Sequence, residues 1–260
     1  MKEHISYSEL KTWNECPYKH KLSYIEEVEK FLGNEYTAFG KAVHDTCEQS
    51  LITEKPIDQN KYFNDRFLQE VQDLITENVT LRPELIQQMR VQAKEILPHV
   101  LPEVEEYFGD YTVVSTEERI YEPIKDQNYN FKGFIDLVLK TKDGKYHIID
   151  WKTCSWGWDS RKKADSIITY QLTLYKHFFA LKHNIDPKNI DTHFALLKRT
   201  AKKNRVEIFK VTSGAKKTEN CLKLLSKAIY NIKNKRHIKN RLSCTQGFGC
   251  EFYNTKHCSR

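Results

Sequence analysis

The chain of 260 residues lacks any apolar run of about 18 residues, so we expect no transmembrane helix and no membrane partner. Its first ten residues, MKEHISYSEL, have no apolar segment of the kind found in signal peptides. We therefore expect a cytoplasmic protein, in which disulfides do not form. The chain also has no internal repeat and no low-complexity linker. These absences favour one compact domain with appendages.

The composition is that of a globular protein with a basic surface. Hydrophobic residues make up 39% of the chain and aromatic residues 12%, which argues against disorder. The formal net charge is +7, and lysine and arginine are concentrated in residues 198–242. Such clusters suit contact with a phosphate backbone, which requires charge rather than sequence-specific geometry. The alternative is a lysine-rich surface that only faces water.

Hydrophobic periodicity predicts helices first and then a sheet. Apolar spacing predicts a helix that breaks near Cys16-Pro17, a second over 37–52 and further helices in 60–108. Alternating patterns predict strands at 111–124, 129–141, 145–153, 190–200 and 205–212. Helical spacing predicts two more helices, at 163–183 and 216–233. This order indicates an α/β fold with a mixed central β-sheet flanked by helices. A helical N-terminal region and a cysteine-rich tail complete it.

Two carboxylates interrupt the predicted hairpin GFIDLVLKTKDGKYHIIDWKT, residues 133–153. Pairing its strands would bring Asp136 and Asp150 together, where they need a cation. Carboxylate oxygens suit Mg²⁺ or Mn²⁺, which also bind phosphate oxygens. Strand alternation puts Lys152 on the same face as Asp150, where an ammonium group can stabilise charge on a reacting phosphate. The alternative is a set of surface charges at a strand end.

Other motifs surround this hairpin in a fixed order. GKAVH carries His44, and YQLTLYKHF carries Gln171 and Tyr175, which share one helical face. With GFID and IIDWK between them, the chain resembles the PD-(D/E)XK nuclease superfamily. The resemblance is to its RecB-like branch, which includes CRISPR-associated adaptation nucleases and phage exonucleases.

The resemblance implies a restriction-endonuclease-like core and a role for each motif residue. The whole of 1–260 would be one nuclease domain, with a helical insertion at about 53–108 and a metal-clasp tail at about 240–260. Mg²⁺ or Mn²⁺ would be held by His44, Asp136, Asp150 and the backbone carbonyl of Trp151. Lys152 would position the attacking water, while Gln171 and Tyr175 would contact the DNA backbone or hold Lys152. Glu118 matches an auxiliary acidic position.

Four cysteines form a second candidate site. Cys16, Cys244, Cys250 and Cys258 resemble the split set that holds a [4Fe-4S] cluster in some members of the branch. The usual tail has Cys-x-x-Cys, whereas Gly247 stands here at the expected first cysteine. Zn²⁺ and unligated thiols are the alternatives. A bound metal would tie the N-terminal helix to the tail as a structural clasp. The remaining cysteines, 47, 154 and 221, we interpret as core residues.

The resemblance favours a metal-dependent DNA nuclease, an exonuclease acting on DNA ends or single strands in recombination, repair or replication. A bacterial or phage protein is implied. The chain has no GxxxxGK[ST] phosphate-binding loop, so unwinding would require a helicase or recombination protein as partner. The alternatives are a catalytically idle DNA-binding or assembly module on the same fold, and an RNA-processing nuclease.

Overall fold

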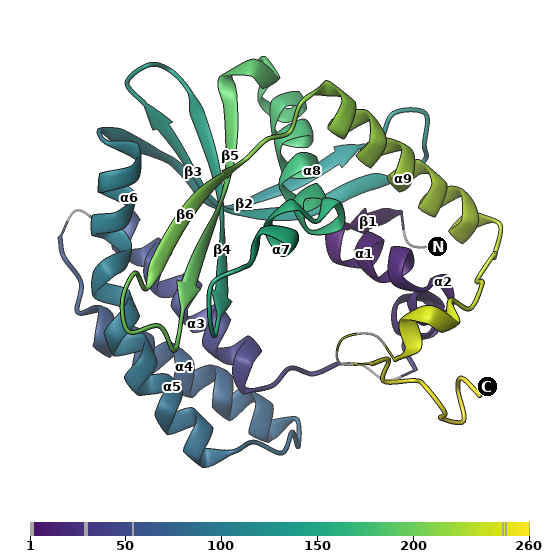
Figure 1. The fold of residues 1–260 in the computed structure, drawn as a ribbon, viewed down its shortest axis with the longest axis horizontal. Helices are drawn as coiled ribbons and strands as arrows, with labels where there is room; N and C mark the ends of the chain where they lie inside the picture. The colour runs from purple at the N-terminus through teal and green to yellow at the C-terminus, as the bar shows by residue number, and fades with distance from the viewer. Residues whose placement is uncertain (1–2, 29–30, 54, 246, 248, 260) are drawn as a thin grey trace. The chain divides into compact units, whose positions relative to one another are not determined.

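A computed structural model describes residues 3–28, 31–53, 55–245, 247 and 249–259. The chain divides into two compact units, and each is described separately below. Unit 1 comprises residues 1–31, 120–133 and 214–260, and unit 2 comprises residues 32–119 and 134–213. Strands β2 and β3 (Figure 1) each contribute residues to both units. No described helix is long and apolar enough to cross a membrane.

Unit 2 is built on a mixed β-sheet. Strands β3, β4, β5 and β6 are adjacent in that order, with antiparallel, parallel and antiparallel pairing, and β2 pairs with β3. The bounds of the strands are β2 Tyr111–Pro123, β3 Asn130–Thr141, β4 Tyr146–Cys154, β5 Ile190–Lys198 and β6 Val206–Val211. The turn between β3 and β4 uses Gly144 with a φ of +82°, a conformation that glycine adopts without strain.

Helices pack on both faces of this sheet. The bounds in unit 2 are α3 Glu35–Ile52, α4 Gln59–Thr76, α5 Pro83–Ile96, η2 Leu97–His99, α6 Val100–Phe108, α7 Ser160–Ala164, α8 Ser166–His183 and η3 Pro187–Asn189. The helices from α3 to α6 share one hydrophobic core with every second residue of the strands, among them Leu137, Ile149 and Trp151. Helix α8 packs on β4 and β5. Residues of β4 that alternate with Ile149 and Trp151, including Asp150, therefore point to the opposite face.

Unit 1 holds the N-terminal helices and the C-terminal segment. Its elements are β1 His4–Ser6, α1 Tyr7–Glu15, α2 Pro17–His20, η1 Lys21–Ile25, α9 Ala215–Lys233 and η4 Arg241–Cys244. Strand β1 pairs in parallel with the first residues of β3. Cys16 ends α1 and caps α2, whose first residue is Pro17. The predicted helix break therefore falls where expected, because proline supplies no backbone N–H for the preceding helix.

The predicted fold class, an α/β fold with a mixed central sheet flanked by helices, is confirmed. One helix differs from prediction: the expected helix over 163–183 is two helices, because Asp165 ends α7 and caps α8 through Ile167 and Ile168. The short β1 was not predicted. The helical insertion at about 53–108 corresponds to α4, α5, η2 and α6. Residue 54 of the insertion and residues 246, 248 and 260 of the tail lie outside the described residues. One nuclease domain over 1–260 stays a prediction.

Candidate active site

Two paired strands bring Asp136 and Asp150 to the same end of the sheet. In the antiparallel register, Leu137 pairs with Ile149, so the two aspartates are the next residues along their strands. The backbone N–H of Trp151 donates a hydrogen bond of 2.7 Å to Oδ2 of Asp136. Strand β4 thus carries one carboxylate and fixes the other. This is the arrangement that the hairpin sequence predicts.

Lys152 and Gln171 both contact the carboxylate of Asp150. Lys152 forms an ion pair with Oδ2, and the side-chain amide of Gln171 donates a hydrogen bond of 2.6 Å to Oδ1. The same amide lies 3.2 Å from the hydroxyl of Tyr175, one helical turn along α8. The structure therefore places Gln171 against Asp150, whereas the sequence suggested a contact with Lys152 or with DNA. Tyr175 is buried, with 6% of its surface exposed.

His44 reaches this end of the sheet from α3. Its Nδ1 lies 3.7 Å from Oδ2 of Asp136. Burial and the charge of Lys152 lower the pKa of His44 to about 4. The imidazole is therefore neutral at physiological pH, the form in which histidine can bind a metal.

Burial sets the electrostatics of the two aspartates. It raises the pKa of Asp136 to about 6 and the pKa of Asp150 to about 6, although Lys152 acts in the opposite direction in both cases. Asp150 is 1% exposed, and its ionised form also repels that of Asp136. The charge of Lys152 does not fully compensate two ionised carboxylates in this buried position, and a divalent cation would supply the remaining positive charge.

The donor set fits Mg²⁺ or Mn²⁺ in its chemistry. It consists of carboxylate oxygens, a backbone carbonyl and a neutral imidazole, and hard oxygen donors are those that these ions prefer. Among the described residues, no three or more His, Cys, Asp or Glu side chains are placed so that they could hold one metal ion together. The side chains of His44, Asp136 and Asp150 would therefore have to adopt other orientations to share one ion.

Glu117 is a member of this site that sequence reasoning missed. Loss of hydration raises the pKa of its carboxyl to about 7, and the charges of Asp136 and Glu48 act in the same direction. Its φ of +45° departs from extended backbone, so the regular alternation of β2 is broken at this residue. That break puts Glu117 in the cleft. The strand pattern alone carries no signal for it, and the only sequence clue is the Glu-Glu pair.

Glu118, the predicted auxiliary acid, makes other contacts. Its carboxylate accepts hydrogen bonds from Ser115, Lys182 and His183, the last two at the end of α8. These bonds outweigh burial and lower its pKa. Glu118 therefore links β2 to α8, and Glu117 is the acidic side chain that faces the other carboxylates.

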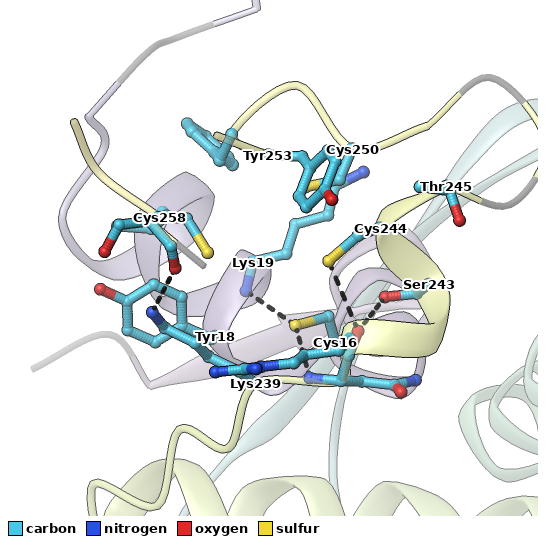
Figure 2. Close-up of a pocket in the computed structure, with 15 residues that line it drawn as sticks. Cys16, Tyr18, Lys19, Lys239, Ser243, Cys244, Thr245, Cys250, Tyr253 and Cys258 are labelled. Carbon is cyan, nitrogen blue, oxygen red and sulfur yellow. Dashed lines mark hydrogen bonds between the residues drawn. The ribbon is translucent and has the colours of Figure 1, made fainter. Parts of the chain in front are cut away.

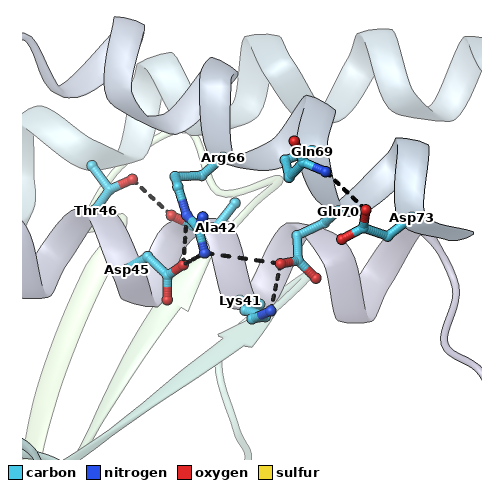
Figure 3. Close-up of polar contacts among 8 residues, drawn as sticks. All are labelled: Lys41, Ala42, Asp45, Thr46, Arg66, Gln69, Glu70 and Asp73. Carbon is cyan, nitrogen blue, oxygen red and sulfur yellow. Dashed lines mark hydrogen bonds and ion pairs between the residues drawn. The ribbon is translucent and has the colours of Figure 1, made fainter.

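A cleft of about 720 Å³ opens beside these residues. Its lining comes from α3, α4, β2 and β4: residues 36, 37, 40, 41, 44 and 45, Arg66, Glu117 and residues 151–153. Arg66 binds Asp45 through Nε at 2.9 Å and Nη2 at 2.7 Å. Figure 3 shows this pair continuing to Glu70 and Lys41 as a row of alternating charges between α3 and α4. Because Asp45 follows His44, this row fixes the helix that carries the imidazole.

The basic region at 198–242 does not belong to a single unit. Residues 198–213 lie in unit 2, and the remainder lies in unit 1. Several of its cations are paired in the free protein, including Arg205 with Glu95 and Lys210 with Asp191. A role along the substrate backbone stays a prediction for the individual side chains of each unit.

The four predicted cysteines line one cavity of unit 1. Cys16, Cys244, Cys250 and Cys258 share a cavity of about 320 Å³. Figure 2 shows their side chains around it, with Lys19 among them. The structure therefore gathers these residues although more than 220 positions separate the first two. The other three lie elsewhere: Cys47 in α3, Cys154 in β4 and Cys221 in α9.

Backbone N–H groups already point at one of these sulfur atoms. Sγ of Cys16 accepts hydrogen bonds from the N–H of Asn240 at 3.3 Å and of Lys19 at 3.5 Å. Hydrogen bonds to the ligand sulfur atoms are a feature of protein sites that hold iron–sulfur clusters. The donor chemistry thus fits a thiolate-held group. The four side chains are not closed on one point in the described residues.

Comparison with known proteins gave matches by family and by fold. The sequence model of a family described as "PD-(D/E)XK nuclease superfamily" matches residues 4–255. A solved structure from Eubacterium rectale named "Putative exonuclease" superposes with a TM-score of 0.60 at 13% identity, covering 94% of this chain and 86% of its own. A second, named SSO0001, gives a TM-score of 0.44 at 13% identity, covering 97% of this chain and 84% of its own. No curated protein matches.

Proposed function

The chain belongs to the PD-(D/E)XK nuclease superfamily, and from this premise we propose that it is a divalent-metal-dependent deoxyribonuclease. The reaction would be hydrolysis of phosphodiester bonds. The observation that carries the proposal is the contact of Lys152 and Gln171 with one buried carboxylate, Asp150, beside Asp136. A carboxylate buried to the extent of Asp150 is costly unless it is paired, which distinguishes it from a surface charge.

We assign the metal to His44, Asp136, Asp150 and the carbonyl of Trp151, with Glu117 as a further acidic group. Mg²⁺ or Mn²⁺ would supply Lewis-acid stabilisation of the phosphate and a water of lowered pKa. Lys152 would hold the attacking water and offset the negative charge that develops on the phosphate. Gln171 would keep the carboxylate of Asp150 in one orientation, and Tyr175 would keep the amide of Gln171 in place.

The mode of action that we propose is exonucleolytic, on DNA ends or single strands in recombination, repair or replication. The likeness in fold to a protein named as an exonuclease supports it. A helicase or recombination protein would provide unwound substrate. Matched linear and covalently closed circular DNA test the mode. The proposal expects loss of the linear form only, and cutting of both forms would contradict it. Labels at either end then give the polarity.

A second cofactor is proposed for the cysteine cavity. We infer that Cys16, Cys244, Cys250 and Cys258 hold a [4Fe-4S] cluster, with Zn²⁺ as the alternative. The shared cavity and the N–H groups directed at Cys16 support this. Protein purified without oxygen should be brown and contain iron and sulfide, and Cys250→Ser should lose them while Cys221→Ser retains them. Colourless protein containing one zinc would favour the alternative, and colourless protein without metal would contradict both.

Two other functions use the same residues and can be separated. An RNA-processing nuclease would cut RNA and leave DNA of the same sequence intact. A catalytically idle DNA-binding or assembly module would bind DNA and cut neither. The side-chain set around Asp150 argues against the idle module, because binding alone does not require a lysine paired with a buried carboxylate.

A further inference from the structure

One face of α3 runs along the cleft from the candidate catalytic end to an aromatic side chain. Tyr36, Gly40 and His44 follow at intervals of four residues, share that face, and line the same cleft as Lys152. A side chain at Gly40 would meet Oγ1 of Thr153 at 3.3 Å, so the helix and β4 approach closely there. Tyr36 and His44 are eight positions apart in the helix, a length of about 12 Å. That length corresponds to a few nucleotides of one strand.

The Tyr36 ring is exposed but firmly held. It is 44% exposed. The guanidinium of Arg199 lies 4.9 Å from its centroid and that of Arg82 lies 5.8 Å away. Arg199 is 9% exposed and donates a hydrogen bond of 2.7 Å to Ser155. The ring therefore rests on a fixed cation while much of its surface faces solvent.

The helix start adds to this rigidity. The side-chain oxygen of Asn34 caps α3 by accepting hydrogen bonds from the backbone N–H groups of Tyr36 and Thr37. The hydroxyl of Thr37 in turn accepts a hydrogen bond from the backbone N–H of Asn34. A fixed aromatic ring beside cationic groups is the combination by which proteins bind single-stranded nucleic acid. The cations neutralise phosphates and the ring stacks on a base. Lys41 and Arg66 line the same cleft but are paired with Glu70 and Asp45, so the cations that carry this inference are the arginines beside the ring.

We propose that Tyr36 stacks on an unpaired base of the substrate, a few nucleotides from the bond that is cut, so that the cleft takes a single-stranded segment of DNA. Bases within a duplex are covered on both faces by their neighbours, and only an unpaired base offers a face to the ring. This inference rests on the proposed nuclease function and assigns Tyr36 as the residue that distinguishes unpaired from paired strands.

The test measures stacking directly. Single-stranded DNA with 2-aminopurine at successive positions is bound to the Lys152→Ala variant, which should hold DNA without cutting it. The fluorescence should be quenched at one or two neighbouring positions. Tyr36→Leu in that background should lose this quenching and bind the single strand about tenfold more weakly, with little change for blunt duplex. Tyr36→Phe should retain both properties, because it keeps the ring.

A matched control separates stacking from general damage. Tyr107 is 41% exposed in the same unit and lies outside the cleft, so Tyr107→Leu should change neither signal. Equal weakening for single strand and duplex, or quenching that survives in Tyr36→Leu, would overturn the inference. Failure of the proposed function looks different: wild-type protein would then cut no nucleic acid with any metal. RNA of the same sequence, tested in parallel, shows whether the ring also accepts ribonucleotides.

Discussion

The amide of Gln171 in α8 donates a hydrogen bond of 2.6 Å to Oδ1 of Asp150 in β4. The same carboxylate forms an ion pair with Lys152 through its other oxygen. Asp150 is thus held from two sides, by Lys152 two residues further along the same strand and by Gln171 in helix α8. The orientation of a buried carboxylate depends on such contacts, so they should matter for activity even where no atom of Gln171 touches substrate.

Gln171→Ala should lower nuclease activity by about 10- to 100-fold, because the Asp150 carboxylate loses its fixed orientation. Gln171→Glu should lower activity further, since a second carboxylate would repel the first. The measurement is kcat as a function of Mn²⁺ concentration. We expect the metal concentration at half-maximal activity to rise in both variants. Unchanged metal dependence and kcat in Gln171→Ala would contradict the positioning role.

Asp136 should make the metal-free protein less stable as pH rises. Its pKa is raised to about 6 from the ordinary 3.8, so the unfolded chain ionises first. The cost is absent below about pH 4, grows through the window between the two pKa values and is complete above about pH 6. It amounts to about 3 kcal/mol. Asp136→Asn should therefore be more stable than wild type at pH 8 in EDTA, but not at pH 3.5.

Divalent cations should reverse this cost. At pH 8, Mn²⁺ should raise the melting temperature of wild-type protein and have little effect on Asp136→Asn. At pH 5 the shift should be smaller, because protons compete for both aspartates. Melting curves with Mn²⁺ and with EDTA at the two pH values check this. A shift that is the same in wild type and variant would place the metal elsewhere.

The adjacent glutamates Glu117 and Glu118 should behave oppositely. Glu118→Gln should destabilise the fold by about 1–3 kcal/mol, because Lys182 and His183 lose a buried partner. Its remaining activity should keep the wild-type metal dependence. Glu117→Gln should leave stability unchanged or slightly higher, since it removes repulsion, and should weaken the response to metal. Urea unfolding and metal titration distinguish the two; a reversed pattern would contradict the assignment.

The sequence predicts the pairing of the two hairpin strands and the residues it brings together, for identifiable reasons. Alternation within two long strands fixes which residues share a face, so Asp136, Asp150 and Lys152 could be placed together from the pattern alone. The prediction that His44 and Gln171 belong to the site depended on the order of motifs in a family, because local periodicity does not show how helices pack. The same holds for the cysteine cavity, which joins distant segments.

Other features follow from local backbone events that a pattern averages out. Glu117 lines the cleft because its own φ is positive. A regular strand pattern for β2 does not predict this change of direction. The interruption at Asp165 depends on a side-chain cap between two helical patterns that merge in sequence. The aromatic group at Tyr36 could not be found from sequence, because its exposure is a property of the tertiary structure.

The most direct test of the central claim is hydrolysis of end-labelled DNA with Mn²⁺, compared between wild type and Lys152→Ala. Lys142→Ala is the matched control, because Lys142 belongs to the same hairpin but pairs with Asp110, outside the cleft. We predict metal-dependent cleavage by wild type and Lys142→Ala, abolished by EDTA, and a loss of about 100-fold or more in Lys152→Ala. Cleavage by Lys152→Ala at the wild-type rate, or none by wild type with any divalent metal, would contradict the account.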